Sequence, residues 1–171
     1  MGLKHKVLAL AVVAMLVAAG FAASSALQAA DTSQETGPVY SLEGAWYGMT
    51  TFPALGPQPT FDTFTSNAQR PGSEGTFLCT IPAQIAGTLT PSGHGNWVRI
   101  GTNSYAFTAE RIIMSGTTFA GLARFWGTIT AVSDQELTGT MNAQFYAPNG
   151  TPISGVASGT IERHRIDITV E

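Results

Sequence analysis

The sequence has 171 residues, of which 44% are hydrophobic and only 11% are charged. Both lysines, Lys4 and Lys6, stand at the very start, so the rest of the chain sets a few arginines against an excess of acidic residues. The composition excludes a disordered chain, because enough apolar surface is present to build a core, and the negative net charge argues against nucleic acid as the main partner.

The first segment has the pattern of an export signal. Two lysines precede an unbroken apolar run over 7–19, and small residues follow it. We therefore expect a signal peptide over 1–29, a flexible lead-in over 30–41 and one mature domain over 42–171. An N-terminal membrane anchor is the alternative. The predicted location after cleavage is the periplasm or the extracellular space, without stable insertion in a membrane.

Cys79 is the only cysteine, so no disulfide can form within the chain and stability has to come from packing. The few histidines are far apart in the predicted sheet, and no phosphate-binding or dinucleotide-binding motif is present. We therefore predict no metal and no cofactor.

From residue 42 onward, nearly every segment alternates polar and apolar residues with a period of two and is rich in Thr, Val, Ile and aromatic residues. Such segments form strands. Short connections predict a meander, and long final strands avoid exposed edges only if the sheet closes. The predicted fold is all-β, an eight-stranded antiparallel up-and-down β-barrel. The predicted strands are 43–52, 60–67, 75–82, 96–101, 104–115, 118–132, 136–147 and 151–168.

The turns between the later strands set the predicted registers. A four-residue turn pairs Val132 with Leu137. A three-residue loop pairs Phe145 with Ile153, and a tight turn lies at 116–117. The resulting inward-facing residues of the middle strands are Tyr105, Phe107, Ala109, Arg111, Leu122, Arg124, Trp126 and Thr128.

Small residues also face inward in these registers, and two interpretations of them remain open. They can leave part of the lumen empty, or they can permit the sharp coiling of a small barrel with no cavity. The small residues are Gly139, Ala143, Gly155, Ala157 and Gly159.

A short motif and a late arginine carry a resemblance. Gly-Ala-Trp-Tyr at 44–47 opens the first predicted strand, and Arg163 and Arg165 lie near the end of the last one. This arrangement resembles the lipocalin signature, in which the tryptophan closes one barrel end and a late arginine packs across its ring. We expect Arg163, which faces inward in the predicted register, to lie over Trp46.

Further segments extend the resemblance over about residues 43–166. The segments 91–97, 105–108, 127–130 and 137–140 are similar to those of small exported lipocalin-like bacterial proteins of the calycin type. The Thr-Asp-Tyr element and the helix after the last strand, expected of extracellular transport lipocalins, are absent from the sequence. The resemblance implies the barrel fold.

The predicted ligand site lies in the mouth half of the lumen. Inward-facing Arg124 and Arg111 require an anionic partner, which is either an internal acid such as Asp62 or a carboxylate of the ligand. His94 stands between two glycines beside the mouth and can contact the same anion. The predicted apolar and aromatic lining consists of Trp97, Tyr105, Phe107, Trp126, Met141 and Phe145.

These observations lead to three hypotheses of function. The first is an exported binding protein that holds a small hydrophobic ligand in the lumen, with an acidic head on the arginines. The second is an enzyme of the cyclase or isomerase type, in which Arg124, Tyr105 or His94 polarises one group of a hydrophobic substrate. The third is a surface or matrix interaction module, suggested by the lysine-free, Thr-rich exterior.

Overall fold

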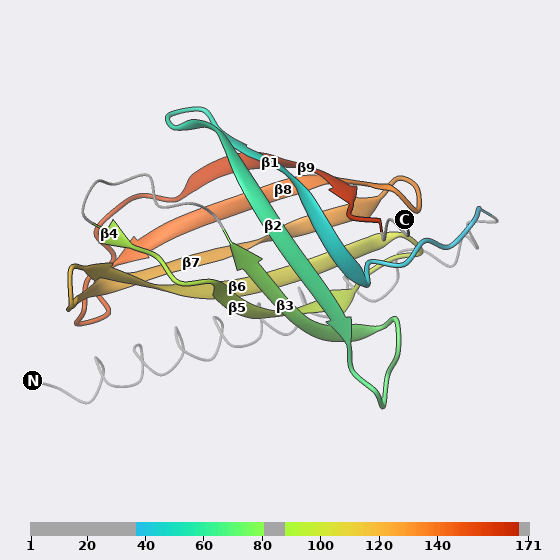
Figure 1. The fold of residues 1–171 in the computed structure, drawn as a ribbon, viewed down its shortest axis with the longest axis horizontal. Coiled ribbons are helices and arrows are strands. Elements are labelled where there is room, and N and C mark those ends of the chain that lie inside the picture. Colours follow the sequence, from blue (N-terminus) through green and yellow to red (C-terminus); the bar gives the residue numbers. More distant parts are fainter. Residues whose placement is uncertain (1–36, 81–87, 168–171) are drawn as a thin grey trace, which may run out of the picture. The chain divides into compact units, whose positions relative to one another are not determined.

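The computed structural model describes residues 37–80 and 88–167. Eight of its strands form a closed antiparallel barrel (Figure 1), which confirms the predicted fold class. No helix in these two ranges is long and apolar enough to cross a bilayer. The strands are β1 (Gly44–Phe52), β2 (Gly56–Ser66), β3 (Glu74–Thr80), β4 (Thr88–Leu89), β5 (Gly93–Arg99), β6 (Ser104–Ser115), β7 (Thr118–Ala131), β8 (Glu136–Tyr146) and β9 (Ala157–Arg165).

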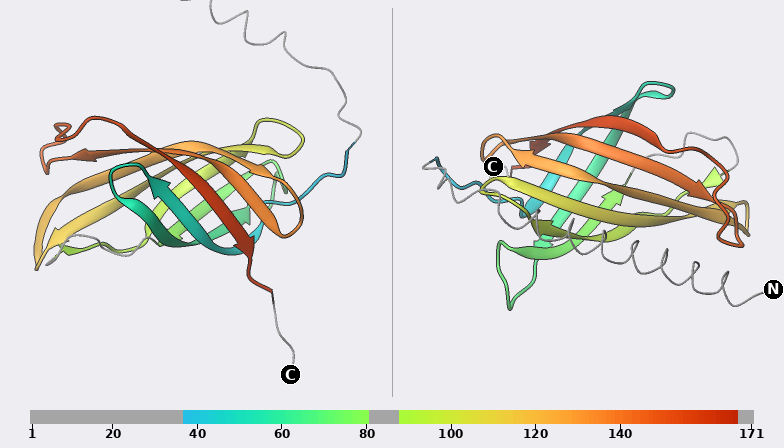
Figure 2. Two further views of the ribbon diagram at one scale, coloured as in Figure 1. Left: turned by 90° about the horizontal axis from the view of Figure 1, so that it is seen from above. Right: turned by 180° about the vertical axis from the view of Figure 1, so that it is seen from behind.

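The order around the barrel follows the chain. The sheet runs β6-β5-β3-β2-β1-β9-β8-β7 and returns to β6, while the two-residue β4 pairs only with the end of β6. Figure 2 shows the long strands β6, β7 and β8 side by side as one broad wall. The predicted signal peptide and most of the lead-in lie outside the described residues.

Alternation along each strand produces the core. In β1 every second residue from Trp46 to Phe52 is buried and the residues between them are exposed, as expected for a strand with one face on a core. Leu137 and Met141 of β8 and Ile161 of β9 are buried as predicted, and Phe145 is partly buried. The predicted inside and outside faces of β8 are therefore confirmed.

The predicted registers of β7 with β8 and of β7 with β6 are each wrong by one residue. Ala131 pairs with Leu137, because Val132 N and Ser133 N both donate to Glu136 O and the turn takes one residue more than expected. On the other side, the ladder shifts between Ile113 and Met114. A one-residue slip exchanges the two faces of a strand. The buried residues of β7 are therefore Gly121, Ala123, Phe125, Ile129 and Ala131.

The irregularity at the start of β7 depends on a glycine. Gly121 has a φ of 146°, a conformation that L-residues with side chains rarely adopt, and an added Cβ would lie 2.1 Å from the carbonyl oxygen of Tyr146. The bulge therefore requires a residue without a side chain at position 121.

The predicted register of β8 with β9 is partly right. Ile153 N donates to Phe145 O at 2.9 Å, as the three-residue loop predicts. Beyond this point the pairing of β9 with β8 is shifted by two residues from the predicted one, so Met141 pairs with Gly159 and not with Ala157. A two-residue shift preserves the faces, and Arg163 faces inward as expected. Ile153, Gly155 and Ala157 are exposed, so their predicted inward placement is wrong.

The glycines of the barrel wall mark close approach of backbones. An added Cβ on Gly127 would lie 2.0 Å from the carbonyl oxygen of Thr140, and one on Gly139 would lie 2.2 Å from that of Thr128. Of the two interpretations of the inward-facing small residues, these distances favour the sharp coiling of the sheet.

One barrel end is sealed by the segment that leads into β1. Leu42 is 1% exposed and its carbonyl oxygen accepts a hydrogen bond from Trp46 Nε1 at 2.9 Å. Tyr40 O accepts a hydrogen bond from the Tyr105 hydroxyl at 2.8 Å, and Tyr40 N donates to Asn103 Oδ1 at 2.8 Å. The buried indole and these bonds close the end at which β1 begins.

The arginine that covers Trp46 is Arg165 and not Arg163. Arg165 stands opposite Trp46 in the β1–β9 ladder, and its guanidinium carbon lies 4.2 Å from the centroid of the indole. The same guanidinium donates to the carbonyl oxygens of Ser41, Glu43 and Asp134. The expected contact therefore exists, but it is displaced by two residues along β9, which places Arg163 deeper in the lumen.

We predict that Arg165→Ala lowers the free energy of unfolding by about 2 kcal/mol, because the indole loses its cation and three carbonyl oxygens lose a charged donor. Arg165→Lys keeps the charge without the planar fork and should recover part of the loss. Urea denaturation measures both. Equal stability of Arg165→Ala and the unmodified protein would contradict the sealing role.

Candidate functional site

The described lumen is filled by side chains. Phe64 and Phe77 stack with ring centroids 4.6 Å apart, and Phe77 meets Phe107 edge to face at 5.3 Å. The cavity found inside the barrel has a volume of about 10 Å³, which is room for about one water molecule. A hydrophobic ligand would have to displace the aromatic core. The residues around this cavity are Thr60, Asp62, Phe77, Cys79, Phe107, Ile129, Met141, Ile161 and Arg163.

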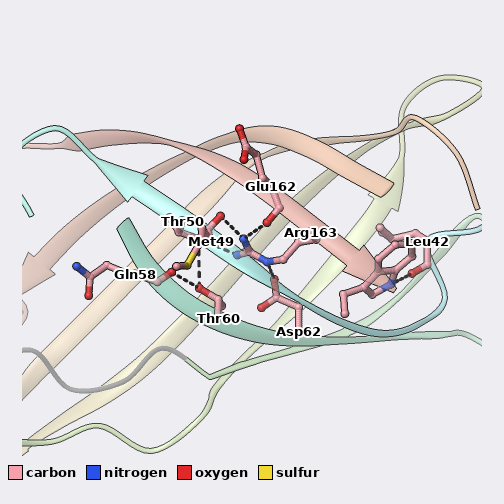
Figure 3. Close-up of polar contacts among 9 residues, drawn as sticks. Leu42, Met49, Thr50, Gln58, Thr60, Asp62, Glu162 and Arg163 are labelled. Atoms are coloured by element: carbon pink, nitrogen blue, oxygen red, sulfur yellow. Dashed lines mark hydrogen bonds and ion pairs between the residues drawn. The ribbon is translucent and has the colours of Figure 1, made fainter. Parts of the chain in front are cut away.

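A polar network centred on Arg163 lies against the cavity (Figure 3). Arg163 is 2% exposed, and its Nε donates to Asp62 Oδ2 at 2.6 Å. Its Nη2 donates to Thr50 Oγ1 at 2.7 Å, and its Nη1 donates to the carbonyl oxygens of Met49 and Glu162. One side chain of β9 thus links β1 and β2 from the inside. An internal acid was one predicted partner for a buried arginine, and here Asp62 serves Arg163.

Burial is the main cause of the pKa shifts of Asp62 and Cys79 in and beside this network. Removal from water raises the pKa of Asp62 above its ordinary value, while the charge and hydrogen bond of Arg163 oppose the rise. Cys79 is 4% exposed, and burial together with the nearby Asp62 raises the pKa of its thiol to about 12. The thiol is therefore protonated at neutral pH and is a poor nucleophile.

Arg111 lies inside the barrel, as predicted. It is 8% exposed, and its guanidinium carbon lies 5.2 Å from the centroid of the Phe125 ring. Burial lowers the pKa of Arg111 from its ordinary value, and the neighbouring Cys79 opposes this effect. The charge of Arg111 is thus enclosed by the core.

A hollow of about 480 Å³ lies on the outer face of the wall formed by β5, β6 and β7. We call it the outer groove. Its lining residues are His94, Gly95, Asn96, Thr108, Ala109, Glu110, Arg124 and Trp126. Gly95 has no side chain, and an added Cβ there would lie 1.9 Å from the carbonyl oxygen of Thr108. Gly95 alternates with the outward-facing His94 and Asn96, so its missing side chain lets the backbones of β5 and β6 approach closely beneath the groove.

The strand registers arrange the groove in two adjacent rows. One row passes from His94 through Glu110 and Arg124 to Gln144. The second row is separated from it by two residues along each strand and consists of Asn96, Thr108, Trp126 and Asn142. Directly opposed residues on one face of a sheet are close enough to interact, so each row presents a continuous line of side chains.

An ion pair stands at the centre of the first row. Arg124 Nε donates to Glu110 Oε1 at 2.8 Å, and Arg124 Nη2 donates to the same oxygen. The guanidinium carbon lies 5.5 Å from the centroid of the Tyr146 ring. The hydrogen bond and charge of Glu110 raise the pKa of Arg124 further. Because both groups are about half exposed, they remain available to a ligand.

A second hollow, of about 590 Å³, adjoins the outer groove. The two share Asn96 and Thr108 in their linings. The second hollow extends toward the start of β3 and is lined there by Glu74, Gly75 and Thr76. Together the two hollows form an elongated depression across the outside of the barrel.

The predicted ligand-binding residues divide between two faces of the wall. Five of them lie in the core and Phe145 is partly buried, while the other three lie in the outer groove. Arg124 and Trp126 were expected inside, and the one-residue slip of β7 turns them outward. His94, expected in a loop, lies on the outer face of β5. The five buried residues are Trp97, Tyr105, Phe107, Arg111 and Met141.

The sequence contained a signal for the correct face of β7. Apolar residues recur at 123, 125, 129 and 131, whereas Arg124, Thr128 and Thr130 alternate with them. Weighing this alternation above the assumed turn length would have placed Trp126 outside. Asn96, Thr108 and Glu110 of the groove were missed, because nothing in the sequence distinguishes them from other outward polar residues.

Comparisons with protein-family models, curated proteins and solved structures give no match to this chain. Within the described ranges, no group of His, Cys, Asp and Glu side chains is arranged to hold a metal ion. The chemistry of the site therefore has to be inferred from its own residues.

We predict that Arg163→Met lowers the free energy of unfolding by about 3 to 5 kcal/mol, because it leaves Asp62 buried beside an uncharged side chain. In the double variant Asp62→Leu with Arg163→Met no unpaired charge remains, so it should be more stable than Arg163→Met alone. A double-mutant cycle by urea denaturation tests the coupling. Additive effects of the two substitutions would show that the two residues are not coupled.

Cys79 reports whether the lumen opens to solvent. At pH 8 a thiol with a pKa of about 12 is ionised in only about one molecule in ten thousand. We therefore expect a disulfide reagent to modify Cys79 readily in denaturant and about a hundredfold more slowly in the folded protein. Similar rates in both states would show that ligands can reach the cavity beside Cys79.

Proposed function

We propose that this chain is an exported binding protein that uses a lipocalin-like barrel as a rigid scaffold and takes a small polar ligand in the outer groove. One observation carries the proposal. The outer groove has a volume of about 480 Å³ and is lined by Trp126, His94 and the Arg124–Glu110 pair. The cavity inside the barrel has a volume of only about 10 Å³. Ligand sites combine concave shape with a few convergent polar groups.

The lipocalin-like character rests on the barrel order and on its sealed end. Consecutive strands are neighbours around the ring, and Trp46 near the start of β1 lies beneath the guanidinium of Arg165 on β9. Export rests on the basic and apolar pattern of the first residues of the sequence. The barrel supplies rigidity, because every strand of the ring has a hydrogen-bonded neighbour on each side.

The outer groove also separates this proposal from the two lumen-based hypotheses. A hydrophobic ligand in the lumen would have to replace core residues such as Phe107 and Met141, which are 4% and 5% exposed. The cyclase or isomerase hypothesis needs Arg124, Tyr105 or His94 beside a substrate in the lumen, whereas Arg124 and His94 line the outer groove. Tyr105 instead lies in the core and hydrogen-bonds to the segment that seals the barrel.

An NMR titration tests the site. The isotope-labelled protein is titrated separately with a set of small neutral polar fragments and with decanoate. We expect the polar fragments to shift the Trp126 indole N–H signal and the amide signals of Asn96 and Thr108, and decanoate to leave the Met141 methyl signal unchanged. Shifts at Met141 with decanoate would place the ligand in the lumen, and an unresponsive groove would also contradict the proposal.

Two substitutions of outward-facing aromatic residues provide the matched comparison. Trp126→Ala removes the aromatic floor of the groove and should abolish the response to the polar fragments. Phe61→Ala removes a side chain that is 54% exposed on β2, outside the groove lining, and should leave the response intact. Equal loss of binding in both variants would show a general effect on the barrel and not a site at Trp126.

A further inference from the structure

The three tryptophans differ sharply in their surroundings. Trp46 and Trp97 are 0% and 2% exposed, and both indole nitrogens donate to backbone carbonyl oxygens. Trp126 is the one that lies partly exposed, on the outer face of β7 and in the lining of the groove. An exposed indole offers a flat apolar surface beside polar groups. Trp126 therefore supplies a platform on which an apolar face of a ligand can lie.

The groups around Trp126 both donate and accept hydrogen bonds. Its row contains the amides of Asn96 and Asn142 and the hydroxyl of Thr108, and it continues to Ser158, whose hydroxyl donates to Asn142 Oδ1 at 2.7 Å. Amides and hydroxyls can satisfy a ligand group of either kind. A ligand rich in hydroxyl groups, each of which is both donor and acceptor, matches this row.

The charges of the groove favour a neutral ligand. Arg124 is already paired with Glu110, and Glu74, which lines the adjoining hollow, is paired with Arg70 at 3.5 Å, so each of these charges is already compensated. The sequence as a whole carries a net charge of −3. Polyanions and basic segments are thus both disfavoured.

The closed sheet disfavours an extended peptide. Peptides that bind to sheets commonly add a strand to a free edge. In the barrel β5 pairs with β3 and β6, β6 pairs with β5 and β7, and β7 pairs with β6 and β8. The walls of the groove therefore offer no backbone edge, and recognition has to occur through side chains.

We propose that the ligand of the outer groove is an uncharged oligosaccharide, which stacks one sugar ring on Trp126 and continues over Thr108 and Asn96 into the adjoining hollow. This inference rests on the proposed function, because it specifies the ligand of the same groove. A pyranose ring has an apolar face of C–H bonds and a rim of hydroxyl groups, which match the indole and the polar row. The two hollows, which share two residues, match a chain longer than one sugar.

The test is a titration with a panel of neutral saccharides from disaccharide to hexasaccharide, built from glucose or from N-acetylglucosamine. Tryptophan fluorescence and the Trp126 indole N–H signal report binding. We expect affinity to rise with chain length until both hollows are occupied. We also expect Trp126 to become protected from quenching by acrylamide. Affinity independent of length would overturn the extended path over Asn96.

Variants locate the contact. Trp126→Ala should weaken binding about tenfold or more, and Trp126→Phe, which keeps an aromatic ring, should weaken it less. Asn96→Ala should weaken the hexasaccharide more than the disaccharide, because Asn96 lies where the two hollows meet. Phe61→Ala serves as the control and should bind normally. Because Trp126 points away from the core, circular dichroism should show each variant folded.

The outcomes separate the two proposals. If the polar fragments shift the groove signals but no saccharide of the panel binds at millimolar concentration, the oligosaccharide inference fails and the proposed site stands. If neither probe reaches the groove, both fail. Saccharide binding that survives Trp126→Ala without loss places the sugar elsewhere and overturns the inference.

Discussion

Closure of β9 against β1 is the constraint on which the remaining structure depends, and Arg163 secures it from inside. Its guanidinium bonds to Asp62 on β2 and to Thr50 and the Met49 carbonyl on β1, while it is itself part of β9. A buried arginine is costly unless its donors are satisfied. The hydrogen bonds that satisfy the donors of Arg163 also join β9 to β1. Closure of the ring in turn encloses the packed interior.

A closed and filled barrel leaves the proposed ligand site on its outer face. The aromatic rings that stack across the lumen leave little internal space, whereas the two hollows described above lie on the outer face of the wall. Trp126 forms the aromatic floor of the outer groove, and the Arg124–Glu110 pair lies beside it in the adjacent row. The barrel thus acts as a support that fixes side chains of four neighbouring strands in rows.

The sequence was sufficient for the class of fold but not for the face of every strand. Alternation and short turns predicted eight strands, closure, and the inward placement of Leu137, Met141 and Arg163. Which face of a strand is buried depends on whether a turn or bulge contains one residue more or fewer than expected. Nothing in the sequence of the turn after Ala131 shows its length. The uncertainty about turn and bulge lengths reversed the predicted faces of Arg124 and Trp126, so side-chain directions were predicted less accurately than the fold.

The seam between β1 and β9 also has a kinetic consequence. The hydrogen bond from Arg165 to the carbonyl oxygen of Glu43 joins residues 122 positions apart, and that from Arg163 to Thr50 spans 113. Contacts of such high contact order form late and slowly. The ring cannot be completed until β9 is available to pair with β1, so the chain remains an open sheet until this last pairing forms.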